Sequence, residues 1–142
     1  MQETITIASR NFPADTAILA ELRSFVGEVL SHLNLNTEAL RNLELAVDEA
    51  AANVIEHAAK IFPCQIGYSC STSENHNLVI CEISWESDTP FQPEAPAQAD
   101  ILERIHTKTP GGLGLFLMHQ LVDDIEFDYT DGRCYVRLSK KV

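Results

Sequence analysis

The sequence predicts an α/β (α+β) two-layer sandwich, in which one mostly antiparallel sheet is covered on one face by helices. Apolar residues alternate with period two in several short segments, and they recur every three or four residues in the segments between them. The resulting order is strand, two helices, two strands, a long loop, a helix and two strands. We expect the 142 residues to form one domain (1–142), because this length suffices for one hydrophobic core.

The first half of the chain predicts one strand and two long helices. Thr4–Ala8 alternates as a strand does, and Asp15 is placed to cap a helix whose apolar residues run from Ile18 to Leu33. Asn34–Asn36 interrupts the pattern, and a second helix is expected from Thr37 to about Ala59. The apolar stripe of this second helix consists of Leu40, Leu43, Val47, Ala50 and Val54.

The second half of the chain predicts four strands, one long loop and one short helix. In order, these are strands at about Gln65–Thr72 and Leu78–Trp85, the loop Glu86–Pro110, a helix at Leu115–Val122, and strands at Ile125–Tyr129 and Cys134–Leu138. Asp131-Gly132 is typical of a two-residue turn between the last two strands. So long an irregular segment inside a compact domain is usually functional, disordered or both.

Composition excludes several classes of function. Ten basic and 21 acidic residues give a net charge of -11, which opposes direct binding to the phosphates of a nucleic acid. No apolar run approaches the roughly 20 residues of a membrane helix, and the N-terminus does not resemble a signal peptide, so we expect a cytoplasmic protein. Cysteine and histidine spacing suggests no zinc site. Cys64, Cys70, Cys81 and Cys134 are expected to be reduced packing residues.

Glu49 and Asn53 form the first candidate site, on the second helix. Residues four apart lie on one face of a helix, and this face is turned away from the apolar stripe. An amide oxygen is a suitable ligand for Mg²⁺, and a carboxylate can orient an attacking hydroxyl. The same two residue types are also common on an ordinary solvated helix face, and the spacing alone leaves that alternative open.

Two further segments suit an anionic or nucleotide ligand. Thr109-Pro110-Gly111-Gly112-Leu113-Gly114 precedes a helix, so its backbone amides and the positive end of the helix dipole are available to phosphate. A flexible loop before a helix has the same composition. At the end of a predicted strand, a carboxylate in Glu86–Phe91 is able to accept a hydrogen bond from an adenine amino group, although an exposed turn fits these residues too.

Taken together and in order, these segments resemble the GHKL ATPases, and specifically their anti-sigma-factor serine kinase branch. LELAVDEAAANVIEHA (Leu43 to Ala58) is similar to the N-box of that family, and GGLGLFLMHQLVDDIEF (Gly111 to Phe127) to its glycine-rich G2 box with the helix and strand that follow. DGRCYVRLSKK, at the end of the chain, is similar to the closing hairpin of the family. The resemblance covers the whole chain and implies a Bergerat-type ATP-binding fold.

The resemblance implies ATP and Mg²⁺ as cofactors and assigns roles to individual residues. Asn53 matches the ligand of Mg²⁺, and Glu49 matches the general base. Gly112 and Gly114 match glycines of the phosphate pocket, and the residues expected around them are Lys108, Thr109, Gly111 and Leu113. The segment from about Pro93 to Thr109 corresponds to a lid over ATP. The implied reaction is transfer of the γ-phosphoryl group to a serine of a STAS-domain anti-anti-sigma protein.

One box departs from the family pattern. The family reads Asp-x-Gly-x-Pro-Phe after this strand, whereas Pro90-Phe91 places Glu86 at the Asp position and Asp88 at the Gly position. The longer carboxylate and the added charge leave open a non-catalytic protein-binding module of the same fold with a degenerate nucleotide pocket. A fragment of a longer phosphatase or sensor kinase is a third alternative. The implied partners are a sigma factor and a STAS protein, and homodimer formation stays open.

Overall fold

We describe the fold from a computed structural model that covers residues 3–13, 15–58, 65–91 and 113–142. Within these ranges the chain forms one five-stranded sheet, in the order β1-β2-β3-β5-β4. Every neighbouring pair of strands is antiparallel. The strands are β1 Thr4–Pro13, β2 Gln65–Ser73, β3 Leu78–Glu86, β4 Asp124–Thr130 and β5 Arg133–Lys141.

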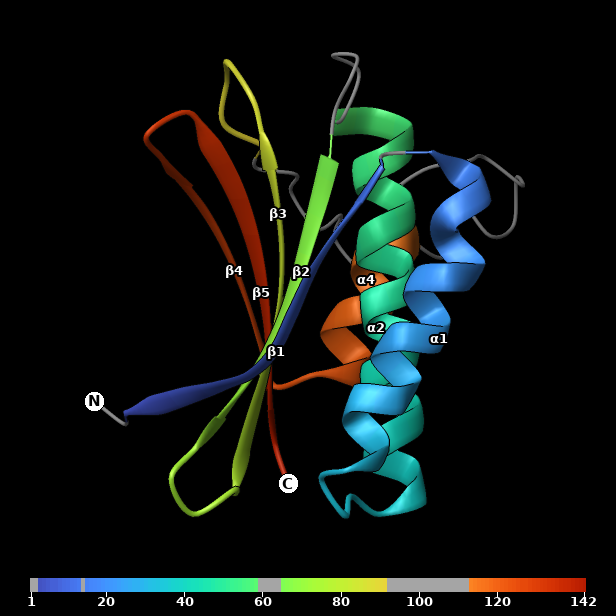
Figure 1. The fold of residues 1–142 in the computed structure, drawn as a ribbon, viewed down its shortest axis with the longest axis vertical. Helices are drawn as coiled ribbons and strands as arrows, with labels where there is room; N and C mark the ends of the chain where they lie inside the picture. The colour runs from blue at the N-terminus through green and yellow to red at the C-terminus, as the bar shows by residue number, and fades with distance from the viewer. Residues whose placement is uncertain (1–2, 14, 59–64, 92–112) are drawn as a thin grey trace.

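The helices of the described residues cover one face of this sheet, as Figure 1 shows. They are a 3-10 turn η1 Thr16–Ile18, the α-helices α1 Leu19–Ser31 and α2 Thr37–Asn53, the π-helix η2 Val54–Ala58, and α4 Leu113–Leu121. The long helix α2 packs against α1 and against α4, and it therefore lies between them. The predicted two-layer α+β class is confirmed. None of these helices combines the length and the apolar character needed to cross a lipid bilayer.

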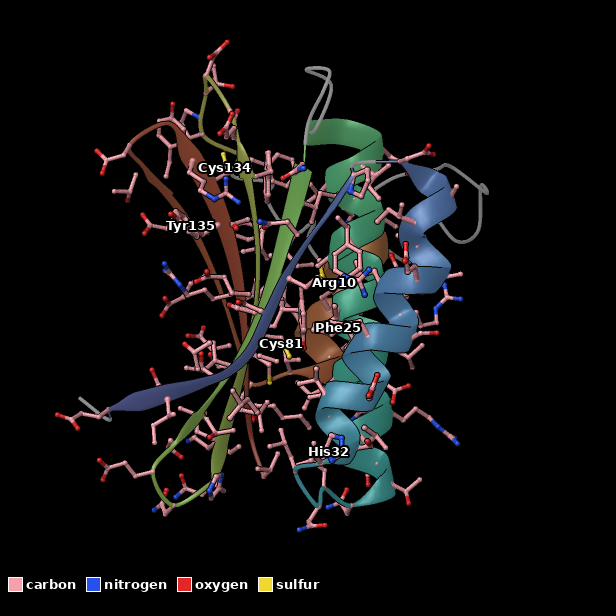
Figure 2. The ribbon with its side chains drawn as sticks, in the orientation of Figure 1. Arg10, Phe25, His32, Cys81, Cys134 and Tyr135 are labelled. Carbon is pink, nitrogen blue, oxygen red and sulfur yellow. The ribbon has the colours of Figure 1, made fainter. Side chains whose placement is uncertain are left out.

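The hydrophobic core lies between the helices and the inner face of the sheet. Along β3, Val79, Cys81, Ile83 and Trp85 are buried, because alternate residues of a strand point to the same side. Their helical partners include the fully buried Leu30 of α1 and Leu43 of α2. The outer face is polar, and Figure 2 shows its side chains pointing away from the helices. Burial of this one face fixes the register of the strands.

Three of the four cysteines lie in this core. Cys70, Cys81 and Cys134 are buried and free, which confirms the expectation of reduced packing residues for them. Cys64 lies outside the described residues. Cys70 and Cys81 are directly opposed on β2 and β3. The hydroxyl of Tyr68 lies 3.4 Å from the Sγ atom of Cys81, so a small polar cluster stands within an otherwise apolar layer.

The first strand is longer than the sequence predicts, because it continues to Pro13 rather than ending at Ala8. Arg10 interrupts the apolar alternation in the sequence, because it is a charged residue on the side of the strand that faces the helices. Its guanidinium group lies 4.6 Å from the ring centroid of Phe12 and 5.7 Å from that of Phe25. It also pairs with Glu21 of α1 at 3.2 Å. A charged residue whose stem packs on aromatic rings breaks the apolar alternation without breaking the strand.

The predicted boundaries of the helices are also corrected in detail. Asp15 caps the 3-10 turn rather than α1, because its Oδ1 accepts from the amide of Ala17 at 3.0 Å. The second helix begins at Thr37 as predicted, and its capping side chain is that of Asn36, which accepts from the amide of Ala39 at 2.7 Å. From Val54 the helix continues as a π-helix rather than as the predicted α-helix. The last helix begins at Leu113, two residues earlier than predicted, so Gly114 belongs to its first turn.

The predicted hairpin turn at Asp131-Gly132 is confirmed. Asp131 has φ 53° and Gly132 has φ 75°, so both central residues have the left-handed conformation of a type I′ turn. An aspartate tolerates this conformation better than most side chains, and glycine adopts it freely. The turn joins β4 to β5 with Thr130 opposite Arg133.

Candidate functional site

Glu49 and Asn53 lie in the C-terminal part of α2, and both are half-buried. Their flank of the helix differs from the flank that meets α1. On that other flank, Asp48 accepts from Arg23 of α1 through contacts of 3.0, 3.1 and 3.2 Å. Successive helical residues are about 100° apart, so Glu49 and Asn53 lie about 100° and about 140° around the helix from Asp48 and are turned away from the α1 flank. Both side chains are half-buried rather than fully solvated.

The helix α4 runs in the opposite direction to α2, as Figure 1 shows. Its N-terminal end therefore lies beside the C-terminal half of α2, which carries Glu49 and Asn53. The first turn of α4 includes Leu113 and Gly114, and its first backbone amides have no partner within the helix. Such a helix end attracts anions through these amides and through the helix dipole.

The other predicted residues of the phosphate segment cannot be placed in this way. Lys108, Thr109, Gly111 and Gly112 lie outside the described residues. The same is true of the segment Pro93–Thr109 that the resemblance matches to a lid. Of the predicted phosphate segment, the structure therefore describes only the start of α4, at Leu113 and Gly114.

The donor set on α2 fits a magnesium ion that is shared with phosphate. Mg²⁺ prefers oxygen ligands, is commonly held by only one or two protein groups, and takes its remaining ligands from water and substrate phosphates. Asn53 offers an amide oxygen, and Glu49 a carboxylate one helical turn away. In the described part of the chain, no group of three or more His, Cys, Asp or Glu side chains is arranged to hold a metal. The residues present fit a metal–nucleotide complex better than a metal ion alone.

The π-helix η2 follows Asn53 directly, since it begins at Val54. Short π-helical segments inside helices are rare, and they occur frequently at functional sites. The widened turn separates Asn53 from the regular helical geometry on its C-terminal side. Nothing in the sequence Val54–Ala58 distinguishes this segment from the α-helix that was predicted there.

Glu86 and Asp88, the predicted adenine-box residues, are both exposed. Glu86 is the last residue of β3 and lies opposite Arg133 of β5. Its neighbour Trp85 is fully buried on the helix side of the sheet, so the alternation of the strand assigns Glu86 to the other side. Asp88 belongs to the loop that follows. The structure does not bring either carboxylate into contact with Glu49 or Asn53.

The loop from Ser87 to Phe91 is attached to the β4–β5 hairpin. The amide of Ser87 donates to the carbonyl oxygen of Gly132 at 3.0 Å, and the hydroxyl of Tyr129 donates to the carbonyl oxygen of Ser87 at 3.0 Å. The thiol of Cys134 lies 3.3 Å from the carbonyl oxygen of Thr89, to which it donates. These three contacts were missed from the sequence, because Tyr129 and Cys134 follow the period-two pattern of ordinary core residues.

Aromatic packing holds the other end of the same loop. The ring of Phe91 packs edge-on against Trp85, with centroids 5.7 Å apart, and against Phe127 of β4, with centroids 6.2 Å apart. The indole Nε1 of Trp85 is buried and has no hydrogen-bond partner among the described residues. An unpaired buried donor is uncommon, because it loses its hydrogen bonds to water without replacement.

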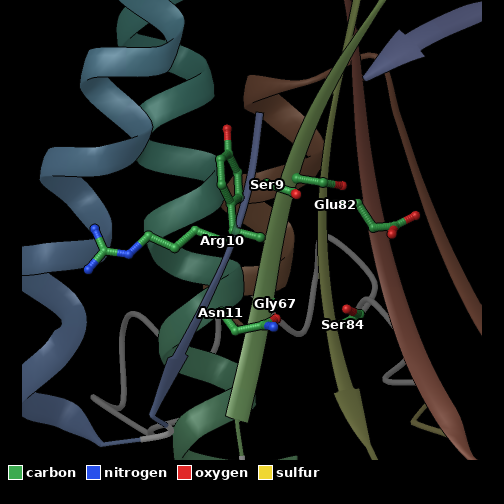
Figure 3. Close-up of a pocket in the computed structure, with 8 residues that line it drawn as sticks. Ser9, Arg10, Asn11, Gly67, Glu82 and Ser84 are labelled. Carbon is green, nitrogen blue, oxygen red and sulfur yellow. The ribbon is translucent and has the colours of Figure 1, made fainter. Parts of the chain in front are cut away.

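A separate cavity lies on the outer face of the sheet, shown in Figure 3. Its volume is about 230 Å³, and its lining residues are Ser9, Arg10, Asn11, Gly67, Tyr68, Ser69, Glu82 and Ser84. Gly67 leaves space in this cavity, because a Cβ atom there would lie only 3.0 Å from Asn11 Oδ1 and from Ser84 Oγ. None of the predicted site residues lines this cavity. This cavity is therefore separate from the candidate site.

Comparison with known proteins assigns the family. The sequence model for the histidine kinase-like ATPase domain matches residues 12–140 of this chain. The chain belongs to the histidine kinase-like ATPase domain family. This domain includes β1 from Phe12 onward, all the described helices and the remaining strands. The matched residues therefore include both Leu43–Ala58 and Gly111–Phe127.

Individual relatives agree with this family. The chain is 24% identical over 136 residues to the serine-protein kinase RsbW of Bacillus pumilus (strain SAFR-032), an alignment that covers 93% of this chain and 84% of the relative. It is 23% identical over 133 residues to the serine-protein kinase RsbW of Bacillus thuringiensis (strain Al Hakam), covering 93% of this chain and 83% of that one.

A solved structure supports the fold independently. It is the crystal structure of the RsbU and RsbW domains of a Mycobacterium tuberculosis protein, with a TM-score of 0.63 at 11% sequence identity. The similar region covers 94% of this chain but only 32% of the other. The histidine kinase-like ATPase domain described here thus spans about a third of that longer chain, and the likeness shows a shared fold.

Proposed function

We propose that this histidine kinase-like ATPase domain is an ATP-dependent serine protein kinase that acts as an anti-sigma factor, phosphorylating a STAS-domain antagonist. The observation that supports the proposal is the packing of α4 against α2, with the N-terminal end of α4 beside the C-terminal half of α2 that carries Glu49 and Asn53. Both residues are half-buried, whereas a solvated helix face would leave them exposed. A helix N-terminus such as that of α4 stabilises an anionic phosphate.

Each residue has a proposed role in phosphoryl transfer. Asn53 holds Mg²⁺ through its amide oxygen, and Glu49 accepts the proton of the substrate serine hydroxyl. Gly112 and Gly114 line the phosphate pocket, together with Lys108, Thr109, Gly111 and Leu113. ATP supplies the γ-phosphoryl group when bound. Because this reaction involves little covalent chemistry by the protein, positioning and charge neutralisation account for most of the catalysis.

The resemblance of the sequence to the anti-sigma-factor serine kinases supports the partners in this proposal. The two Bacillus relatives are named as serine-protein kinases and align with almost the whole chain. We therefore propose a sigma factor and a STAS-domain protein as binding partners of this chain in the cytoplasm. The net charge of -11 supports a protein partner over direct contact with DNA, because an acidic surface is repelled by phosphate. A homodimer is the proposed oligomeric state.

A second candidate function is a non-catalytic binding module of the same fold. Glu86 and Asp88 favour it, since both carboxylates are exposed and neither is the residue type that the family pattern has there. A carboxylate that fails to reach the adenine amino group forgoes a hydrogen bond of roughly 1–3 kcal/mol. Such a loss would weaken nucleotide binding by about tenfold to a hundredfold.

Phosphate transfer from γ-labelled ATP to purified STAS-domain proteins of the source organism tests the first function. We expect one of them to be labelled on serine by the natural protein and by Glu44→Gln, but not by Glu49→Gln. Glu44 is the matched control, because it is also a half-buried glutamate of α2 but lies on the flank that meets α1. Equal labelling by Glu49→Gln would contradict the role of Glu49, and binding of STAS proteins without any labelling would favour the second function.

A further inference from the structure

The hairpin β4–β5 forms hydrogen bonds with both backbone polar groups of Ser87. The amide of Ser87 donates to Gly132, and its carbonyl oxygen accepts from the Tyr129 hydroxyl, each at 3.0 Å. Ser87 also stabilises its own loop, because its Oγ lies 2.7 Å from the carbonyl oxygen of Thr89 and 3.2 Å from the amide of Thr89. The residue between Glu86 and Asp88 is therefore fixed to an element more than 40 residues further along the chain.

We propose that Tyr129 is a positioning residue for nucleotide binding, which acts by fixing the backbone at Ser87 and thereby the loop Ser87–Phe91. This inference rests on the proposed function, which assigns Glu86 and Asp88 to the adenine side of the nucleotide site. Tyr129 itself does not touch the nucleotide in this proposal. Its hydroxyl sets the position of the backbone that carries the two flanking carboxylates.

Geometry favours a specific role over general packing. The ring of Tyr129 is only half-buried, and its hydroxyl is the atom that reaches across from β4 to the carbonyl oxygen of Ser87. Apolar packing of this region is supplied separately by Phe91, which lies against Trp85 and Phe127. Removal of the hydroxyl alone would thus free the Ser87 carbonyl while leaving the aromatic cluster in place.

The type I′ turn fixes the other backbone polar group of Ser87, which is its amide. Gly132 accepts from the Ser87 amide through its carbonyl oxygen, and that oxygen is oriented by the left-handed backbone of the turn. Tyr129 and Gly132 therefore hold the two polar groups of one peptide segment from one rigid hairpin. A nucleotide that contacts this loop meets a preformed backbone, and preorganisation of this kind lowers the entropic cost of binding.

The test compares Tyr129→Phe with Tyr135→Phe. Tyr135 is the matched control, because it is a half-buried tyrosine of the same hairpin that lies opposite Ser84, beside Arg137 on the outer face. We expect Tyr129→Phe to raise the Kd for Mg-ATP and the KM for ATP by about threefold to tenfold, with kcat unchanged, and Tyr135→Phe to stay within about twofold of the natural protein. A structural role without positioning would alter kcat and KM together or neither.

A second readout does not depend on nucleotide. Hydrogen exchange at the Ser87 and Thr89 amides measures directly how often the loop opens. The fluorescence emission of Trp85, the single tryptophan of the chain, also responds to the position of the loop. We expect faster exchange in Tyr129→Phe and no change in Tyr135→Phe. Unchanged exchange, or unchanged ATP affinity despite faster exchange, would overturn the inference. Absence of ATP binding by the natural protein would instead overturn the proposed function, and the positioning role with it.

Discussion

Arg23 of α1 holds both carboxylate oxygens of Asp48 of α2, with Nη2 3.0 Å from Oδ1 and 3.1 Å from Oδ2. The two side chains are 57% and 32% exposed, so solvent screens much of their attraction. We expect Asp48→Asn to lower the free energy of unfolding by about 0.5–1 kcal/mol in low salt. A double-mutant cycle with Arg23→Gln, followed by urea unfolding in low and in high salt, measures the pair. A coupling free energy that does not fall with salt would contradict this account.

Gly132→Ala tests the left-handed turn. A side chain at φ 75° is strained, and we expect the substitution to cost about 1–2 kcal/mol of the free energy of unfolding. Gly27→Ala is the contrasting control in α1, where an added Cβ meets its nearest atom, Glu44 Oε1, at 3.7 Å. That variant is expected to gain about 0.5–1 kcal/mol, because alanine favours a helix over glycine. Equal effects of the two substitutions in denaturant unfolding would count against the turn geometry.

The buried cluster of Tyr68 and Cys81 predicts loss of stability in alkali. Burial raises the pKa of the Tyr68 hydroxyl far above its ordinary value. The hydrogen bond with the Cys70 thiol and burial together raise the pKa of Cys81. The unfolded chain releases these protons near their ordinary pKa values of about 8.5 for cysteine and about 10 for tyrosine. The stability from these groups is therefore fully present below about pH 8 and is lost as pH rises above it.

Tyr68→Phe tests the predicted direction of this pH dependence. Each proton retained only by the folded state contributes a slope of about 1.4 kcal/mol per pH unit to the free energy of unfolding. We expect the variant to show a shallower loss of stability above about pH 10 than the natural protein. Urea unfolding between neutral and alkaline pH provides the measurement. An identical slope in Tyr68→Phe would remove Tyr68 from the explanation.

Much of the fold follows from patterns that the sequence carries locally. The hairpin at Asp131-Gly132 and the stripe that buries Leu43 and Val47 are examples, because turn chemistry and helical periodicity each depend on neighbouring residues. The second half of β1 was missed, since Arg10 gains its place from the rings of Phe12 and Phe25, one of which belongs to another element. Such long-range contacts leave no periodic signal.

The candidate site also combines features that the local sequence predicts with features that depend on contacts between distant segments. The spacing of Glu49 and Asn53 was sufficient to place both on one flank, because it is set by the helix. That α4 packs on α2, and that Tyr129 reaches Ser87, depend on how distant segments pack. The π-helix after Asn53 likewise has no recognisable sequence pattern in Val54–Ala58.

The two unusual residues of the adenine box lead to a prediction of gained function. Glu86→Asp combined with Asp88→Gly shortens one carboxylate and removes another charge, and both positions are exposed, so the fold should tolerate the change. We expect the double variant to bind Mg-ATP about tenfold more tightly than the natural protein. Calorimetric titration measures this affinity. Weaker binding by the double variant would show that Glu86 and Asp88 are the residues this pocket requires.

The most direct test of the nucleotide site is calorimetric titration of the natural protein with ATP and Mg²⁺, repeated with Asn53→Ala and with Asn42→Ala. Asn42 is the matched control, since it is a half-buried asparagine of the same helix, about three turns before Asn53. We predict magnesium-dependent binding by the natural protein and by Asn42→Ala, and a loss of at least about tenfold in affinity for Asn53→Ala. Equal affinity of all three proteins, or no binding by the natural protein, would contradict a nucleotide site at Asn53.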